Sequence, residues 1–220
     1  YINSHYETRY NQMKHRMEWR KKGEEDFVML DDMVSNSIWM ELNEAGYPCS
    51  VKNMENLIYS DFSFSYHPIR EYINHLPQWD GIDHIGRLAE SVHTIPAQRE
   101  FWLKGFRHFL VGMVAAATQE EIVNHLCLLL CSKQNLGKTT FINKILSNDL
   151  RTDYLSTGII SAGNKDDLSR MAEFMLINFD EFEGMTGHEL SLLKDLITRK
   201  FISIRLPYAR HTLNLPHWAS

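Results

Sequence analysis

Hydrophobic and polar residues follow a helical spacing through much of the first half of the chain. From Asp31, apolar residues recur at helical intervals up to Ala45 and Gly46 follows, which predicts a helix that ends there. Ser50 is a favourable N-cap for a second helix that runs through Ser60. Two short helices joined by a tight turn resemble half of a helix-turn-helix, a geometry that also occurs without any nucleic-acid role. The pattern predicts both helices and leaves DNA binding by them open.

Prolines mark the boundaries of the helices that follow. Pro68 suits the first position of a helix and Pro77 ends it. Asp83 is predicted to cap a further helix, and Pro96 to open a long one. The buried stripe of the long helix is predicted to contain Trp102, Phe106, Phe109, Leu110, Met113 and Val114. We therefore expect a mainly helical domain over residues 1–97 and a second domain over residues 98–220.

The first 22 residues are polar and basic. Residues Tyr1–Lys22 contain six Lys and Arg residues against two Glu residues, a local balance of +4. Because short charge runs usually face water, we predict a solvated helix that ends at Gly23. The alternative is an arm that contacts DNA, although the acidic residues 24–26 cancel most of the local charge.

Two apolar runs in the second half have the length of buried strands, Leu126–Cys131 and Phe174–Phe179. The first run leads into the spacing of a phosphate-binding loop, G-x-x-x-x-G-K-[ST], with Ser132 in the place of the first glycine. An apolar helical pattern follows the loop. Strand, loop and helix in this order predict an α/β fold with a P-loop NTPase core.

Each matched residue has a role that phosphate chemistry requires. Gly137 lets the backbone turn so that N–H groups point at phosphate oxygens, Lys138 neutralises phosphate charge, and the hydroxyl of Thr139 binds Mg²⁺. The predicted ATP-binding residues are Ser132, Gln134, Asn135, Leu136, Gly137, Lys138, Thr139 and Thr140. The alternative is a surface loop in which Gly-Lys-Thr occurs by chance.

The second apolar run ends in an acidic pair. A buried strand would deliver Asp180 to the sheet edge at which open α/β sheets bind ligands. We predict that Asp180 holds Mg²⁺ and that Glu181 orients and deprotonates the attacking water, with Lys138 as the other catalytic residue. A strand that ends in a solvent-facing Asp-Glu turn is the alternative.

A basic segment follows the helix predicted after Thr186. From Leu196 to Ser220 there are four Lys and Arg residues and no acid, and the pattern indicates a short strand pair. Such a segment suits contact with nucleic-acid phosphates or with the nucleotide of a neighbouring subunit, while a solvated hairpin is the alternative. The predicted contact residues are Arg199, Lys200, Arg205, Tyr208 and Arg210.

Composition narrows the class of protein. The formal net charge is −5, so a nucleic-acid surface must be local, and 44% hydrophobic residues are ample for a core. The three cysteines lack a disulfide or metal spacing, which predicts reduced core thiols in a cytoplasmic protein. No apolar run is long enough to span a bilayer, and no signal segment opens the chain. The first residue is Tyr1, from which we expect an excised fragment.

Four motifs in order resemble one known family: residues 67–72 with 76–81, the P-loop, residues 177–181, and residues 205–210. Together they resemble the virulence-associated protein E family of P-loop ATPases from phages and mobile elements, which are similar to superfamily 3 helicases. The resemblance implies ATP and Mg²⁺ as cofactors, single-stranded DNA and a primase as partners, and a homo-oligomeric ring. It also implies that the chain continues past Ser220 in its relatives, so the helicase-like (AAA+-like) core would be C-terminally incomplete.

These observations predict an ATP-hydrolysing, helicase-like protein in DNA replication of a phage or mobile element. Two other functions stay open. One is a non-catalytic module in which nucleotide binding controls assembly with a primase. The other is a small-molecule kinase, although the adjacent Asp180 and Glu181 suit activation of water.

Overall fold

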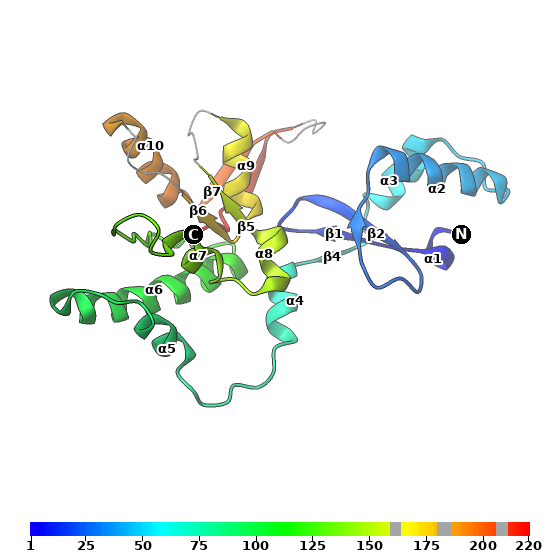
Figure 1. Ribbon diagram of the computed structural model, residues 1–220. Coiled ribbons are helices and arrows are strands. Elements are labelled where there is room, and N and C mark those ends of the chain that lie inside the picture. Colours follow the sequence, from blue (N-terminus) through cyan, green and yellow to red (C-terminus); the bar gives the residue numbers. More distant parts are fainter. Residues whose placement is uncertain (159–163, 180–185, 206–210) are drawn as a thin grey trace. The chain divides into compact units, whose positions relative to one another are not determined.

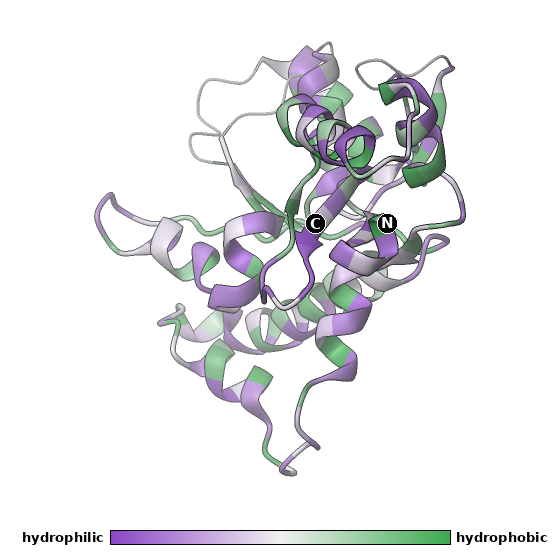
Figure 2. Ribbon diagram, turned by 90° about the vertical axis from the view of Figure 1, so that its right-hand side faces the viewer, coloured by the Kyte–Doolittle hydropathy of each residue, from purple (hydrophilic) through white to green (hydrophobic). Residues whose placement is uncertain are grey.

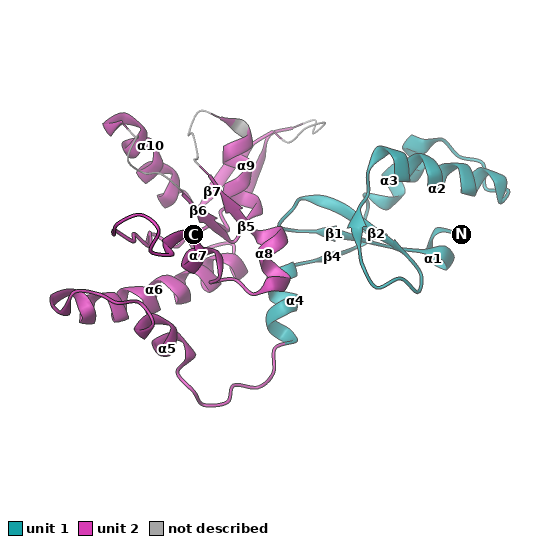
Figure 3. Ribbon diagram, in the orientation of Figure 1, with its two compact units in different colours: residues 1–75 teal, residues 76–220 magenta. Residues whose placement is uncertain are grey.

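The chain forms two compact units, Tyr1–His75 and Leu76–Ser220 (Figure 3). A computed structural model describes residues 1–158, 164–179, 186–205 and 211–220. The units divide at Leu76, earlier than the boundary after residue 97 that the proline pattern predicted. Helix α5 (His84–Glu90) explains the difference, because it packs with α6 of the second unit.

The N-terminal unit is a sheet with helices (Figure 1). Its four strands follow the order β3-β2-β1-β4. Strands β1 and β2 are antiparallel, whereas β1 and β4 are parallel. The elements are α1 (Ile2–His5), β1 (Tyr6–Asn11), β2 (Arg16–Lys21), β3 (Val28–Met29), α2 (Asp32–Glu44), α3 (Val51–Ile58), β4 (Phe64–Tyr66) and α4 (Pro68–Asn74).

The solvated helix predicted for Tyr1–Lys22 is wrong, because most of this segment forms the β1–β2 hairpin. Burial alternates over the first four residues of β1, where Tyr6 and Thr8 are buried and Glu7 and Arg9 are partly exposed. Period-two burial of this kind belongs to a strand with one covered face. The basic residues concealed this alternation in the sequence, and the mainly helical N-terminal domain is corrected to a mixed one.

Local capping signals placed α2 and α3 correctly. The side chain of Asp31 accepts a hydrogen bond from the backbone of Val34, and Ser50 does the same for Asn53. Both helices then pack on one face of the sheet, where the buried cluster comprises Ile2, Tyr6, Met17, Leu30, Ile38, Leu42, Met54 and Ile58. The hydroxyl of Tyr6 donates to Glu41 of α2, which joins sheet and helix.

Helix α4 begins at Pro68, as predicted, and His67 is its N-cap. The backbone N–H of Arg70 donates to His67 Nδ1. His67 is buried, and this burial, together with the positive charge of Arg70, lowers its pKa from 6.5 to about 4. The neutral imidazole is therefore part of the folded structure at neutral pH.

The second unit contains six α-helices, one 3₁₀ helix and four strands among its described residues. They are α5, the 3₁₀ turn η1 (Pro96–Gln98), α6 (Arg99–Thr118), α7 (Lys138–Asn143), α8 (Asn148–Tyr154), β5 (Leu155–Thr157), α9 (Lys165–Glu173), β6 (Leu176–Asn178), α10 (Gly187–Thr198), β7 (Phe201–Ile204) and β8 (Leu213–Pro216). Strands β5 and β6 are parallel, and β7 and β8 form an antiparallel pair. A buried cluster joins α9, β6 and this hairpin.

Helix α6 has the amphipathic pattern that the sequence predicted, although Trp102 is only partly buried. Phe106, Phe109, Leu110 and Met113 are buried, but Val114 is 40% exposed. Hydrophilic and hydrophobic residues are mixed along the helices (Figure 2). Among the described helices, none combines the length and the apolar character that crossing a membrane requires.

The predicted strand at Leu126–Cys131 is wrong, because this run has no strand partner and Leu129 is 68% exposed. Both edges of β6 already carry hydrogen-bond partners. Strand β5 pairs with one edge. On the other edge, Ser220 O accepts a hydrogen bond from Ile177 N, and Ser220 N donates one to Met175 O. A strand needs an open edge, which β6 does not offer to residues 126–131 here. Cys127 and Cys131 are accordingly exposed rather than core thiols.

Candidate nucleotide site

The loop that precedes α7 contains a left-handed turn. Gly137 has φ +80° and Asn135 has φ +61°. A Cβ atom at Gly137 would meet no heavy atom within 4 Å, so the backbone conformation, not the space, requires glycine there. The first helical bond of α7 runs from Phe141 N to Gly137 O at 2.8 Å. The turn at Gly137 therefore sets the direction in which the helix leaves the loop.

The side chain of Lys138 folds back over the loop. Its Nζ donates to Ser132 O at 3.0 Å, Ser132 Oγ at 3.1 Å and Lys133 O at 2.8 Å. An ammonium group has three donors, and three oxygens lie around this one. The loop thus holds a positive charge in contact with Ser132, the residue in the place of the first glycine of the motif.

Serine is compatible with the first position of this loop. Among the described non-glycine residues, only His15 and Asn135 have positive φ, so Ser132 lies in the ordinary region that any residue adopts. Its hydroxyl also accepts from Lys138. The departure from the motif therefore creates no backbone strain and adds one contact to the lysine.

The other predicted ATP-binding residues lie along the same loop and the first turn of α7. Gln134, Asn135, Leu136 and Thr140 are exposed, and Thr139 is partly buried. None of these residues belongs to the buried core.

A direct contact joins α7 to the strand that leads to the acidic pair. Asn178, the last residue of β6, donates from Nδ2 to Asn143 Oδ1 at the end of α7, at 2.8 Å. Asn178 O also accepts from Gly158 N at 3.1 Å, beyond the end of β5. The carboxyl ends of β5 and β6 therefore meet beside the helix that follows the loop. Sequence spacing contained no signal for this asparagine pair.

Arg170 of α9 is a second residue that the sequence did not single out. Its Nε donates to Ser156 Oγ at 2.8 Å, and its Nη2 donates to Thr157 O at 2.8 Å. Its Nη1 lies 3.2 Å from Asp167 Oδ1. The guanidinium group fastens α9 to the carboxyl end of β5, at the same edge of the sheet as Asn178.

The acidic pair and the tip of the basic hairpin lie outside the described residues. Strand β6 is present where the sequence predicted it and is buried. Asp180 and Glu181, which follow it, fall in the undescribed range 180–185, and Tyr208 and Arg210 fall in 206–210. Their roles remain predictions.

The hairpin itself is present, with Ile202 and Ile204 buried on one side of β7. Arg199 forms an ion pair with Asp195, and Lys200 forms one with Glu121. Arg205 is exposed at the end of the described part of the hairpin. The structure therefore gives two of the predicted contact residues carboxylate partners within the chain, which a nucleic acid would have to displace.

A buried histidine supports the base of the hairpin. His217 donates from Nδ1 to Arg199 O at 2.8 Å. Burial lowers the pKa of His217 below its ordinary value. The imidazole is therefore a neutral packing group and not a source of positive charge for this surface.

Comparisons with known proteins place the fold and the family. The fold is similar to two apo structures of the NrS-1 C-terminal region, with TM-scores of 0.54 and 0.52 and 10% sequence identity in each case. The similarity covers 99% of this chain and 53% of those chains, so the chain spans about half of their length. A search of curated proteins finds no match. Residues 73–218, more than half of the chain, match the virulence-associated protein E-like domain, and the protein therefore belongs to the virulence-associated protein E-like family.

Proposed function

We propose that this chain binds ATP at the loop Ser132–Thr140 and hydrolyses it during DNA replication of a phage or mobile element. The observation that carries the proposal is the Lys138 ammonium group, which three oxygens of Ser132 and Lys133 hold at the mouth of the loop. The left-handed turn at Gly137 and membership of the virulence-associated protein E-like family support it.

The residues around the loop fit a bound triphosphate. Lys138 would exchange its loop oxygens for phosphate oxygens, which are stronger acceptors because they are charged. Gly137 and Asn135, both with positive φ, would present backbone N–H groups to the same anion. Thr139 would supply a hydroxyl to Mg²⁺, which neutralises phosphate charge when it is bound with ATP.

In the proposed hydrolysis, Asp180 would complete the metal site and Glu181 would accept a proton from the attacking water. Lys138 would stabilise the negative charge that develops on the transferring phosphoryl group. The contact between Asn178 and Asn143 supports this arrangement, because it anchors the end of β6, two residues before Asp180, to the helix that follows the loop.

Partners of the full-length protein belong to the same proposal. Arg205 on the hairpin would contact single-stranded DNA or the nucleotide of a neighbouring subunit in a ring, and a primase would act with the assembly. Arg199 and Lys200 would contribute after release from Asp195 and Glu121. Exchange of one carboxylate for a phosphate is nearly balanced in energy at an exposed site, so Arg199 and Lys200 are expected to add little to the affinity.

The first test is ATP binding by the chain itself. Lys138→Ala removes the ammonium group and should weaken binding of a fluorescent ATP analogue by about tenfold or more, since a hydrogen bond to a charged group contributes about 1.5–3 kcal/mol. Lys144→Ala is the matched control, because Lys144 is an exposed lysine at the end of the same helix. Equal affinities for the wild type and both variants would remove the proposed nucleotide site.

The second test is turnover by the full-length protein, with and without single-stranded DNA. We expect hydrolysis that is lost on Glu181→Gln while ATP binding is retained. Binding of ATP without turnover in the wild type would instead support a module in which nucleotide occupancy controls assembly with a primase. Phosphate transfer to a small acceptor would indicate a kinase.

A further inference from the structure

The N-terminal sheet has a second face, opposite the one that α2 and α3 cover. The strand register places Arg9 opposite Glu18 on β2 and opposite Phe64 on β4, and it places Glu18 opposite Met29 on β3. Partners in register point to the same side of a sheet, so these four residues form one row across all four strands. Tyr6 and Thr8, at the intervening positions of β1, point into the buried side.

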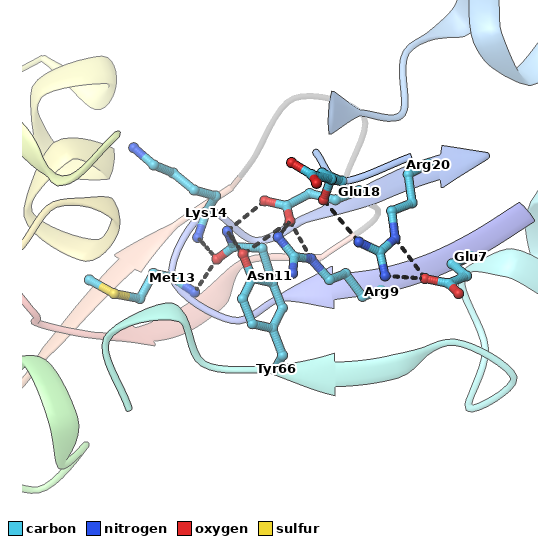
Figure 4. Close-up of polar contacts among 9 residues, drawn as sticks. Glu7, Arg9, Asn11, Met13, Lys14, Glu18, Arg20 and Tyr66 are labelled. Carbon is cyan, nitrogen blue, oxygen red and sulfur yellow. Dashed lines mark hydrogen bonds and ion pairs between the residues drawn. The ribbon is translucent and has the colours of Figure 1, made fainter. Parts of the chain in front are cut away.

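A stack of planar groups lies on this face, which we name the Arg9 face after its central residue. The guanidinium carbon of Arg9 lies 3.8 Å from the ring centroid of Phe27 and 3.8 Å from that of Tyr66. The guanidinium group is held by Glu18, whose Oε2 accepts from Arg9 Nε at 2.7 Å and from the Tyr66 hydroxyl at 3.0 Å (Figure 4). The planes are therefore fixed before any ligand arrives.

Exposed groups adjoin this stack. Phe64 is 60% exposed and Met29 is 48% exposed. Arg16 is exposed on the next row toward the β1–β2 turn, opposite Asn11, with its Nη1 3.2 Å from Met29 Sδ. The same sheet surface thus carries an accessible aromatic ring on the edge strand β4, and a cation beside an apolar side chain at the opposite edge, on β2 and β3.

The charge of the hairpin favours a polyanion. Glu7 and Glu18, the only acids of Tyr1–Lys22, form ion pairs with Arg20 and Arg9. The segment also contains Lys14, Arg16, Lys21 and Lys22, and its formal charge balance is +4. Lys14 and Arg16 lie at the β1–β2 turn, whereas the acidic residues 24–26 follow the opposite end of β2. Within residues 1–26, the formal positive charge is therefore greatest near the β1–β2 turn, at the end of the Arg9 face that carries Arg16.

We propose that the Arg9 face binds single-stranded DNA, with Phe64 stacking on a base and with Lys14 and Arg16 contacting backbone phosphates. Single strands fit this surface better than a duplex, because only unstacked bases can stack on a protein ring. The choice of DNA rests on the proposed function in replication. The surface itself belongs to the N-terminal unit and shares no residue with the nucleotide loop or the basic hairpin.

Fluorescence anisotropy of the full chain with a labelled oligothymidylate of about 16 nucleotides, long enough for one site of this kind, tests the proposal. No ATP is added. Phe64→Ala should weaken binding about tenfold, because loss of one base–aromatic stacking contact lowers the affinity by roughly this factor. Phe64→Trp should retain binding. Tyr59→Ala is the control within the same unit, because Tyr59 is 57% exposed at the end of α3 and should leave the affinity unchanged.

Salt dependence tests the phosphate contacts. Arg16→Ala should lower the affinity and reduce the slope of log K against log salt by about 0.7, the value for one phosphate contact on a single strand. Lys52→Ala, which removes an exposed charge from α3, should change neither. Circular dichroism of each variant shows whether it is folded.

Four outcomes would overturn the proposal. They are no binding by the wild type, affinities for Phe64→Ala and Arg16→Ala equal to those of the controls, tighter binding of a duplex of the same length, and tighter binding of oligouridylate. Lys138→Ala should leave this binding unchanged. Loss of the proposed ATP site with an intact Phe64 effect would refute the proposed function alone, and the reverse result would refute the DNA surface alone.

Discussion

Gly137 and Gly105 allow the same substitution to be compared in two backbone conformations within one compact unit. Gly137 has φ +80° at the start of α7, whereas Gly105 lies inside α6. A Cβ atom would meet no heavy atom within 4 Å at either position. Replacement by alanine therefore tests the backbone conformation without a contribution from steric overlap.

The two substitutions should act with opposite signs. Gly105→Ala should raise the free energy of unfolding by about 1 kcal/mol, because alanine is the better residue in a helix interior. Gly137→Ala should lower the free energy of unfolding by about 1–2 kcal/mol, because alanine is strained in the left-handed conformation. Reduced entropy of the unfolded chain offsets part of this, about 0.4–1 kcal/mol. The two variants should thus differ by roughly 2 kcal/mol, with Gly137→Ala the less stable.

Urea unfolding, followed by circular dichroism, measures both variants on the transition of the same unit. Gly137→Ala should also weaken ATP binding, because relief of the strain moves the backbone N–H groups of the loop, whereas Gly105→Ala should leave binding unchanged. If Gly137→Ala stabilised the chain as Gly105→Ala does, the loop would not contain a left-handed turn at this position.

Two further predictions concern single contacts. Asn178→Ala should destabilise the chain by about 1 kcal/mol and weaken ATP binding, because it removes the hydrogen bond to Asn143; a double-mutant cycle with Asn143→Ala should show coupling, and additive effects would exclude the contact. His67, whose pKa is lowered to about 4 by burial and by Arg70, binds its proton less readily in the folded than in the unfolded chain. The stability that neutral His67 gives to the folded chain is therefore complete above pH 6.5 and is lost as pH falls from about 6.5 toward about 4. His67→Asn, which keeps an N-cap, should reduce this dependence in urea unfolding series at different pH values, and an unchanged profile would contradict the assignment.

Local signals in the sequence were sufficient for most helices. Asp31, Ser50, Asp83 and Thr186 each cap the helix that the pattern predicted, and Thr186 forms a reciprocal capping box with Glu189. Such caps act through backbone groups two or three residues away, so they depend little on the rest of the fold. The left-handed turn at Gly137 is equally local, because only glycine adopts this conformation without strain.

The strands were harder to place because pairing depends on residues far apart in the chain. The alternation of Tyr6 and Thr8 indicates a strand only once α2 and α3 cover one side of it. The apolar run Leu126–Cys131 has the composition of a buried strand, yet β5 and Ser220 already use the edges of β6. Composition therefore gave a correct prediction for β6 and an incorrect one for residues 126–131.

The sequence by itself determined the loop motif and the N-caps of α2, α3, α5 and α10, because spacing and capping act over a few residues. Tertiary structure decided which groups meet: Asn178 with Asn143, Arg170 with the end of β5, and Arg9 with the ring of Tyr66. These pairs lie far apart in the chain, and no local pattern reports them. Sheet register and helix packing bring them together, and both depend on burial of the whole core.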